Sequence, residues 1–117
     1  MKLGEVKSIL SAEVYTDTPY EELEVYSACG SDLMSDVLAF VKDQSVLITG
    51  LCNPQVIKTA DMMDMKCVVI VRGKMPDESI IELARQKGIT LMKCSLRMYL
   101  ACGMLYAKGL GAGEHSL

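Results

Sequence analysis

The sequence has no tryptophan, only one phenylalanine and only one histidine among its 117 residues. The histidine, His115, lies in a glycine-rich stretch near the carboxyl end, where a catalytic side chain would be poorly positioned. A Ser-His-Asp or Cys-His pair therefore cannot be built on a rigid element. The G-x-x-x-x-G-K-[ST] motif of phosphate-binding loops is also absent, so the chain lacks that route to phosphoryl transfer. These absences favour a protein without catalytic activity of its own.

Long apolar runs and an excess of basic residues are absent as well. Half of the residues are hydrophobic, yet no uninterrupted apolar run approaches the ~20 residues that a membrane span needs. The net charge of −3 and the pI of about 5.1 argue against non-specific binding of nucleic acid, which needs a basic surface. The first five residues contain an acid and no apolar segment follows, unlike a signal peptide. We expect a cytoplasmic protein that contacts neither membrane nor nucleic acid.

The cysteines are odd in number and show no C-x-x-C spacing. They are Cys29, Cys52, Cys67, Cys94 and Cys102. Without a secretion signal, free buried thiols are favoured over a disulfide framework, and we expect no metal site and no cofactor. Cys52 and Cys94 each follow a predicted strand and precede a helix, a position that can lower a thiol pKa. A redox-sensing or iron–sulfur role is therefore kept as an alternative.

Three short apolar runs, at 46–49, 67–71 and 89–92, alternate with segments of helical periodicity. Continuous β-branched runs of this length are typical of parallel strands that helices cover on both faces. The length of the chain indicates a single domain. We therefore predict a three-layer α/β/α domain with a largely parallel central sheet over residues 1–110, followed by a flexible tail at 111–117.

Periodicity and capping residues define the other elements. We expect a helix at 3–10, strands at 12–15 and 23–29 with Gly30 ending the second, and helices that begin near Ser31, Pro54, Pro76 and Ser95. Asn53 and Ser95 are the expected amino-terminal caps, and Gly88 is the expected carboxyl-terminal cap. The helix after Ser31 places Leu33, Val37, Leu38 and Val41 on one stripe. Gly103, within the last helix, indicates either close approach to another backbone or a merely tolerated glycine.

Two acids, Asp32 and Asp36, lie at the predicted start of that helix. Paired carboxylates can serve acid–base chemistry or hold a metal. A capping residue and a solvated neighbour, both favoured by the positive end of the helix, are the preferred interpretation.

Candidate ligand contacts lie where the predicted strands end. In open α/β sheets, ligands bind beyond the carboxyl ends of the strands, where helix amino termini also attract anions. The candidates are Thr49, Gly50, Asn53, Arg72, Gly73, Lys74 and Ser95. Arg72 and Lys74 would contact phosphate, and Thr49, Gly50, Asn53 and Ser95 would donate hydrogen bonds, which fits a nucleotide or another phosphorylated metabolite. Alternatively, these are ordinary turn residues and surface charges.

A second hypothesis is a structural or interaction protein. The last predicted helix carries Tyr99, Leu100, Met104 and Tyr106, more apolar surface than one layer hides. Exposed apolar patches usually mark interfaces, and a symmetric homodimer is the first expectation. A protein partner is the other possibility.

Several segments together resemble a known family. The run Ser31-Asp32-Leu33-Met34-Ser35-Asp36-Val37 resembles the S-D-L-L-S-D-V segment of small proteins with a DRTGG domain. The strand ending at Ile48-Thr49, the helix start at 76–78, the strand entry at 88–89 and the closing segment at 105–110 fit the same family. The chain differs at the family's glycine pair, which is here Thr49-Gly50-Leu51 in one unit and Arg72-Gly73 in the other.

This resemblance implies an α/β/α domain related to the amino-terminal domain of HPr kinase/phosphorylase and of the muramoyl-peptide ligases. It also implies a regulatory setting, since such domains occur beside nucleotide-binding CBS modules in pyrophosphatases and in phosphotransacetylases. For stand-alone members it implies association with iron hydrogenases or histidine-kinase-like ATPases. We therefore expect a non-catalytic regulatory or ligand-sensing module, with a homodimeric interaction scaffold as the alternative.

Overall fold

The computed structural model describes residues 1–40 and 45–112 of the chain. The described helices and strands follow one another in this order: α1 (Leu3–Leu10), β1 (Glu13–Val14), β2 (Ala28–Gly30), α2 (Met34–Phe40), β3 (Val46–Thr49), α3 (Pro54–Met62), β4 (Cys67–Ile70), α4 (Glu78–Lys87), β5 (Thr90–Lys93) and α5 (Met98–Ala107).

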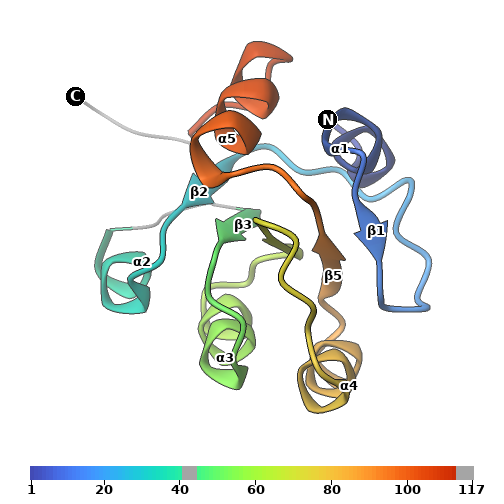
Figure 1. Ribbon diagram of the computed structural model, residues 1–117, viewed down its shortest axis with the longest axis vertical. Coiled ribbons are helices and arrows are strands. Elements are labelled where there is room, and N and C mark those ends of the chain that lie inside the picture. The colour runs from blue at the N-terminus through green and yellow to red at the C-terminus, as the bar shows by residue number, and fades with distance from the viewer. Residues whose placement is uncertain (41–44, 113–117) are drawn as a thin grey trace.

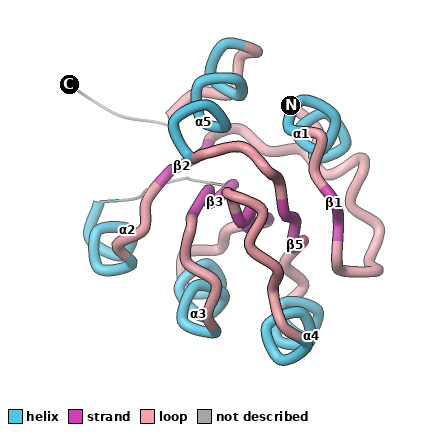
Figure 2. The backbone as a smooth tube through the Cα atoms, viewed as in Figure 1, coloured by secondary structure: helices cyan, strands magenta, loops and turns pink. Residues whose placement is uncertain are grey.

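The strands form one sheet in the order β1-β5-β4-β3-β2. Strands β2 to β5 are parallel, and the two-residue strand β1 pairs antiparallel with β5. Figure 2 shows β1 beside β5 at one edge of the sheet. The central pairs are in continuous register, with Val46 opposite Cys67 and Cys67 opposite Thr90. The prediction of a largely parallel sheet is therefore confirmed.

Helices cover both faces of this sheet. Figure 1 shows α1 and α5 on one side and α2, α3 and α4 on the other. Side chains alternate along each strand, so Val46 and Ile48 pack beneath α1 and α5, whereas Leu47 packs with the other three helices. Strands β3 and β4 are buried along their whole length, which explains their unbroken apolar sequences. The predicted three-layer architecture is confirmed.

Asn53 and Gly88, the caps predicted for α3 and α4, act as expected. The Asn53 side chain accepts a hydrogen bond from the Val56 amide at 3.2 Å, and Pro54 occupies the first helical position. Asp77 caps α4 in the same way through the Ile80 amide. Gly88 ends α4 with a φ of 71°, in the left-handed region.

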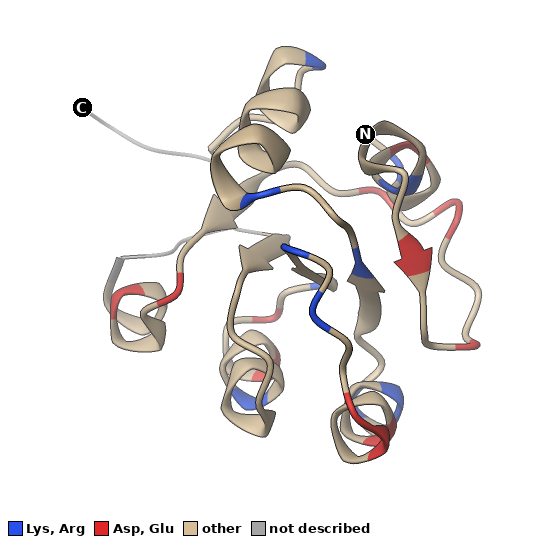
Figure 3. Cartoon of the chain, in the orientation of Figure 1, with Lys and Arg blue, Asp and Glu red and all other residues tan. Residues whose placement is uncertain are grey.

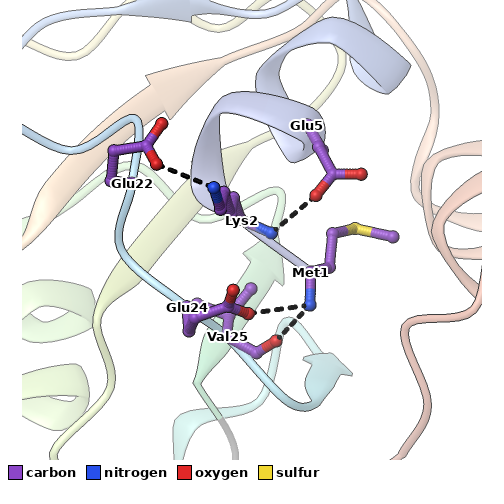
Figure 4. Close-up of polar contacts among 6 residues, drawn as sticks. All are labelled: Met1, Lys2, Glu5, Glu22, Glu24 and Val25. Atoms are coloured by element: carbon purple, nitrogen blue, oxygen red, sulfur yellow. Dashed lines mark hydrogen bonds and ion pairs between the residues drawn. The ribbon is translucent and has the colours of Figure 1, made fainter.

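The predicted strand at 23–29 is wrong in extent, since β2 covers only Ala28–Gly30 and includes the glycine expected to end it. The preceding residues pair with the amino terminus instead: the Leu3 amide donates to the Leu23 carbonyl and the Val25 amide donates to the Met1 carbonyl. Figure 4 shows the polar contacts of the same region, where the terminal ammonium contacts Glu24 and the Lys2 ammonium contacts Glu22. Alternation in this segment therefore reflects pairing outside the sheet.

Helix α2 begins later than predicted, and of its predicted buried stripe only Val37 is confirmed. It starts at Met34, and the buried side chains are Met34 and Val37. Leu33 and Leu38, expected in the buried stripe, are exposed. Val41 lies outside the described residues.

The predictions for the last helix also need correction. Ser95 is not its cap, because α5 begins three residues later with Arg97 at the capping position. Gly103 does not mark a close approach, since a methyl group there would have no neighbour within 4 Å. After the helix, the Gly111 carbonyl accepts a hydrogen bond from the Ala28 amide at the edge of the sheet, and 113–117 of the predicted tail lie outside the described residues. None of the described helices is long and apolar enough to cross a membrane.

The close approach occurs instead at Gly30, where β2 lies against α5. A methyl group on Gly30 would stand 2.6 Å from the Cys102 sulfur. We predict that Gly30→Ala lowers the free energy of unfolding by about 1–3 kcal/mol through overpacking, measured by chemical denaturation. In a Cys102→Ala background the same substitution should cost less than about 0.5 kcal/mol, because the obstructing atom is gone.

Gly103→Ala is the matched control for this experiment. It adds the same methyl group to a glycine in open space within a helix, so it should raise the stability by up to about 1 kcal/mol. Equal costs of Gly30→Ala with and without the Cys102 sulfur would contradict the packing described here.

Candidate functional site

The carboxyl ends of β2, β3, β4 and β5 lie along one edge of the sheet because these strands are parallel. The connections that leave this edge are 31–33, 50–53, 71–77 and 94–97. We call this group of four connections the rim. Figure 3 shows an acid on the β2–α2 connection and basic residues on the β4–α4 connection and at the start of α5.

Asp32 joins the first two connections of the rim. Its Oδ1 atom accepts hydrogen bonds from the Gly50 amide at 2.6 Å and from the Thr49 hydroxyl at 3.2 Å. The Thr49 oxygen in turn accepts from the Leu51 amide at 3.1 Å, so a fully buried hydroxyl is satisfied. The predicted capping role of Asp32 is replaced by this contact, because α2 begins at Met34 and the Leu33 carbonyl accepts from the amides of Asp36 and Val37.

Gly50 joins the second connection to the third. The Arg72 guanidinium lies directly against the Gly50 backbone, and its Nη2 atom donates to the Gly50 carbonyl at 3.5 Å. A methyl group on Gly50 would stand 2.9 Å from Arg72 Cζ and 3.2 Å from Asp32 Oδ1. The buried backbone of Gly50 therefore contacts both charged groups, the Arg72 guanidinium and the Asp32 carboxylate.

The backbone of Arg72 joins the third connection to the fourth. Arg72 and Gly73 have φ angles of 63° and 69°, in the left-handed region that a non-glycine residue adopts only at a cost of about 1–2 kcal/mol. This conformation directs the Arg72 amide to the Leu96 carbonyl and the Gly73 amide to the Cys94 carbonyl, both at 2.8 Å. The four connections of the rim are thereby linked in series by hydrogen bonds.

The other predicted contacts divide into accessible and committed groups. Lys74 and Ser95 are exposed on the rim, Ser95 between the two carbonyls that receive the Arg72 and Gly73 amides. The Thr49 hydroxyl and the Gly50 amide, predicted as donors to a ligand, already donate to Asp32, and the Gly73 amide donates to the Cys94 carbonyl. The side-chain oxygen of the exposed Asn53 accepts from the Val56 amide, so that atom serves the helix cap.

One further residue lies on the rim that sequence reasoning missed. Arg97 is exposed immediately after Leu96, whose carbonyl accepts the Arg72 amide. The sequence could have indicated Arg97, because it is a basic residue soon after the end of a strand. It was overlooked because the helix was expected to begin at Ser95. Asp36, by contrast, lies exposed in the first turn of α2 as expected.

The thiols near the rim are not activated. Burial raises the pKa of Cys52, and the nearby Asp77 carboxylate raises it further against the opposing effect of Lys74. Burial likewise raises the pKa of Cys94 and outweighs a hydrogen bond from the Leu96 amide. The prediction of lowered thiol pKa values is wrong, since burial dominates over helix proximity. Within residues 1–40 and 45–112, no three metal-ligating side chains of His, Cys, Asp or Glu gather.

A second hollow, distinct from the rim, lies between β2 and α5. This groove has a volume of about 440 Å³ and is lined by small residues and by two tyrosines, among them Ala28, Gly30, Gly103, Tyr99 and Tyr106. Helix α5 carries no charged residue from Met98 to Ala107, yet Tyr99 is 93% exposed and Tyr106 is 70% exposed. We call the groove together with the exposed side chains of Tyr99, Leu100 and Tyr106 the α5 face.

Comparisons with known proteins bear on this arrangement. The sequence model of the DRTGG domain matches residues 5–106. Among solved structures, the chain is similar to the CBS and DRTGG domains of the regulatory region of Clostridium perfringens pyrophosphatase, complexed with the activator diadenosine tetraphosphate. The TM-score is 0.70 at 17% sequence identity, over 89% of this chain and 45% of that chain, so the likeness shows the fold. No curated protein sequence matches the chain.

The two acids of the α2 segment should differ sharply when replaced. Asp32→Ala removes the acceptor of a backbone amide and of a buried hydroxyl, so we predict a loss of about 1–2 kcal/mol in the free energy of unfolding. Asp36→Ala, the matched control at an exposed position, should change it by no more than about 0.5 kcal/mol. Urea denaturation of both variants checks this, and equal losses would contradict the role assigned to Asp32.

Proposed function

This chain belongs to the DRTGG domain family, and from that premise we propose that it is a non-catalytic regulatory module that binds a phosphorylated small molecule at the rim. A nucleotide is the leading ligand class. A cytoplasmic location is part of the same proposal.

The state of the Arg72 side chain carries this proposal. The guanidinium has five N–H donors, and within the described residues its one hydrogen bond is the 3.5 Å contact to the Gly50 carbonyl. The side chain is exposed, so the remaining donors face solvent. A planar guanidinium that lies against the backbone of a strand end suits bidentate binding of phosphate oxygens.

The surroundings of Arg72 favour a built site over an ordinary turn. A left-handed backbone at a non-glycine residue is typical of functional positions, where the surrounding structure enforces it. Here two backbone bonds hold that conformation, from the Arg72 and Gly73 amides to the β5 connection. The glycine at position 50 leaves room for the guanidinium against the end of β3, which supports the proposal that the arginine is positioned for a ligand.

Two other cations strengthen the local field. Lys74 is exposed on the same connection as Arg72, and Arg97 is exposed on the neighbouring connection, although the chain as a whole has a net charge of −3. Local concentration of positive charge at strand ends attracts anionic ligands and raises their association rate. The accessible Ser95 hydroxyl adds a neutral donor beside them.

The family setting supports a regulatory role. The pyrophosphatase whose DRTGG-containing regulatory region has this fold is complexed with an activating dinucleotide. Our chain covers less than half of that region, so the ligand of that protein guides the choice of probes for this one and nothing more.

We predict that phosphate-bearing ligands stabilise the protein and that Arg72→Ala abolishes the effect. The probes for a thermal-shift assay are phosphate, pyrophosphate, adenine nucleotides and cyclic dinucleotides. At about ten times the dissociation constant, a binding ligand should raise Tm by about 5 °C. No shift with any probe would contradict the proposal.

Two control variants separate charge from position. Lys108→Ala removes a positive charge beyond the far end of α5, so the ligand-induced shift should be unchanged. Gly50→Ala keeps every charge but displaces the guanidinium, which should weaken binding while costing little stability, because the displaced group is the end of a flexible side chain.

A second candidate function is a homodimeric interaction scaffold, and the α5 face favours it. A helix that is apolar on all sides is normally buried, whereas this one leaves two tyrosines and a leucine in solvent. Tyrosine is enriched at the centres of protein interfaces. In this proposal a second copy of the chain, or a protein partner, covers the face, and the module needs no small ligand.

The scaffold proposal makes a prediction about mass. Sedimentation equilibrium should show a mass that rises with protein concentration toward twice that of the monomer. The double substitution Tyr99→Ser/Leu100→Ser should abolish the rise. Met62→Ser, which removes an exposed side chain of α3 on the opposite face of the sheet, should leave it intact. A monomer at all concentrations would remove self-association from consideration.

A further inference from the structure

We infer that the rim selects phosphorylated ligands that carry hydroxyl groups, such as ribonucleotides, by pairing the Arg72 guanidinium with the Asp32 carboxylate. This inference rests on the proposed function and names the ligand class of the same site. The juxtaposition of the two side chains on Gly50 carries it.

The carboxylate has one oxygen committed and one available. Both hydrogen bonds of Asp32 are to Oδ1, from the Gly50 amide and the Thr49 hydroxyl. Within the described residues no hydrogen bond uses Oδ2, and the side chain is exposed. An ionised carboxylate only accepts hydrogen bonds, so its free oxygen suits a ligand hydroxyl or amine.

The two charged groups are adjacent but form no direct ion pair. Asp32 Oδ1 and Arg72 Cζ lie 3.2 Å and 2.9 Å from the same point, the position of a methyl group on Gly50. Yet among the described residues the ion pairs include none between them. Both side chains instead form hydrogen bonds with the β3 connection: Asp32 accepts from the Gly50 amide, and the Arg72 guanidinium donates to the Gly50 carbonyl.

The Asp32 carboxylate would not favour binding of phosphate alone. A fixed negative charge beside the guanidinium repels an approaching phosphate and lowers its affinity. The cost is offset when the ligand also brings a hydroxyl donor to the same place. A ribose phosphate meets both requirements, and acidic side chains bind ribose hydroxyls beside pyrophosphate sites in other α/β folds.

Asp32→Asn tests this without disturbing the rim. The asparagine oxygen can still accept from Gly50 and Thr49, while an amide NH₂ replaces the free carboxylate oxygen. The probes are the four common ribonucleoside 5′-diphosphates, their 2′,3′-dideoxy analogues and pyrophosphate, with dissociation constants from isothermal titration calorimetry. Equal thermal stability of the variant and the parent chain verifies that the rim is intact.

The substitution should act in opposite directions on the two ligand types. We expect it to weaken binding of at least one ribonucleoside diphosphate about tenfold, as loss of a hydrogen bond to a charged group does. It should tighten pyrophosphate by about threefold, because a repulsive charge is removed. The dideoxy analogues should bind the parent chain about as weakly as the ribonucleotides bind the variant.

The possible failures are distinguishable. If the substitution tightens or leaves unchanged all three ligand types, or if dideoxy and ribose forms bind the parent chain equally, the hydroxyl inference is overturned and the phosphate site stands. If none of the probes binds the parent chain, the proposed function fails and takes the inference with it. If Asp32→Asn lowers the stability of the protein, the inference is overturned as well. The negative charge of Asp32 would then be needed for folding and not for ligand selection.

Discussion

The absence of a side chain at position 50 is the constraint on which the rim depends. Gly50 is buried at the end of β3, and its backbone is held by the Asp32 carboxylate on one side and covered by the Arg72 guanidinium on the other. Any larger residue would displace the guanidinium. The left-handed backbone of Arg72, which is costly in itself, then aligns two amides with the β5 connection. Gly50 thus lets the guanidinium lie against the β3 connection, while the backbone amides of Arg72 and Gly73 join it to the β5 connection.

The same contacts relate the two candidate surfaces of the domain. The Arg72 amide donates to the Leu96 carbonyl, two residues before α5 begins, and α5 carries the exposed tyrosines and the groove against β2. Under the proposed function, a ligand that engages Arg72 acts on the connection that sets the start of this helix. A regulatory module needs such a physical link between a ligand site and an interaction surface. The ligand-sensing and scaffold proposals are therefore compatible within one molecule.

The sequence predicted the parts of the fold that burial determines. Strands β3 and β4 lie between two layers of helices, so their sequences are continuously apolar and their positions were correct. Caps such as Asn53 and Gly88 were correct because they act within one turn of their own position. The errors lie at the edge of the sheet, where alternation at 23–27 serves pairing with the amino terminus, and in α2, where Val37 is buried as predicted but Leu33 and Leu38 are exposed.

The candidate site was predictable only in part, for the same reason. Strand order along the sequence placed Thr49, Gly50 and Arg72 at one edge, and the structure brings them together with Asp32. Contacts between connections depend on the orientation of side chains and on the backbone φ angles of the connections. Neither can be deduced from a single sequence. Asp32 was therefore assigned to its own helix, and Arg97 was overlooked.

Amide chemical-shift mapping by NMR tests the central claim most directly. With isotope-labelled protein titrated with ADP and, separately, with pyrophosphate, our account predicts that the largest shift changes fall together on Gly50, Arg72, Gly73 and Ser95. These residues belong to three connections that meet only at the rim. Changes confined to α5 and β2, or to a single connection, would contradict the claim that the strand ends form one binding site.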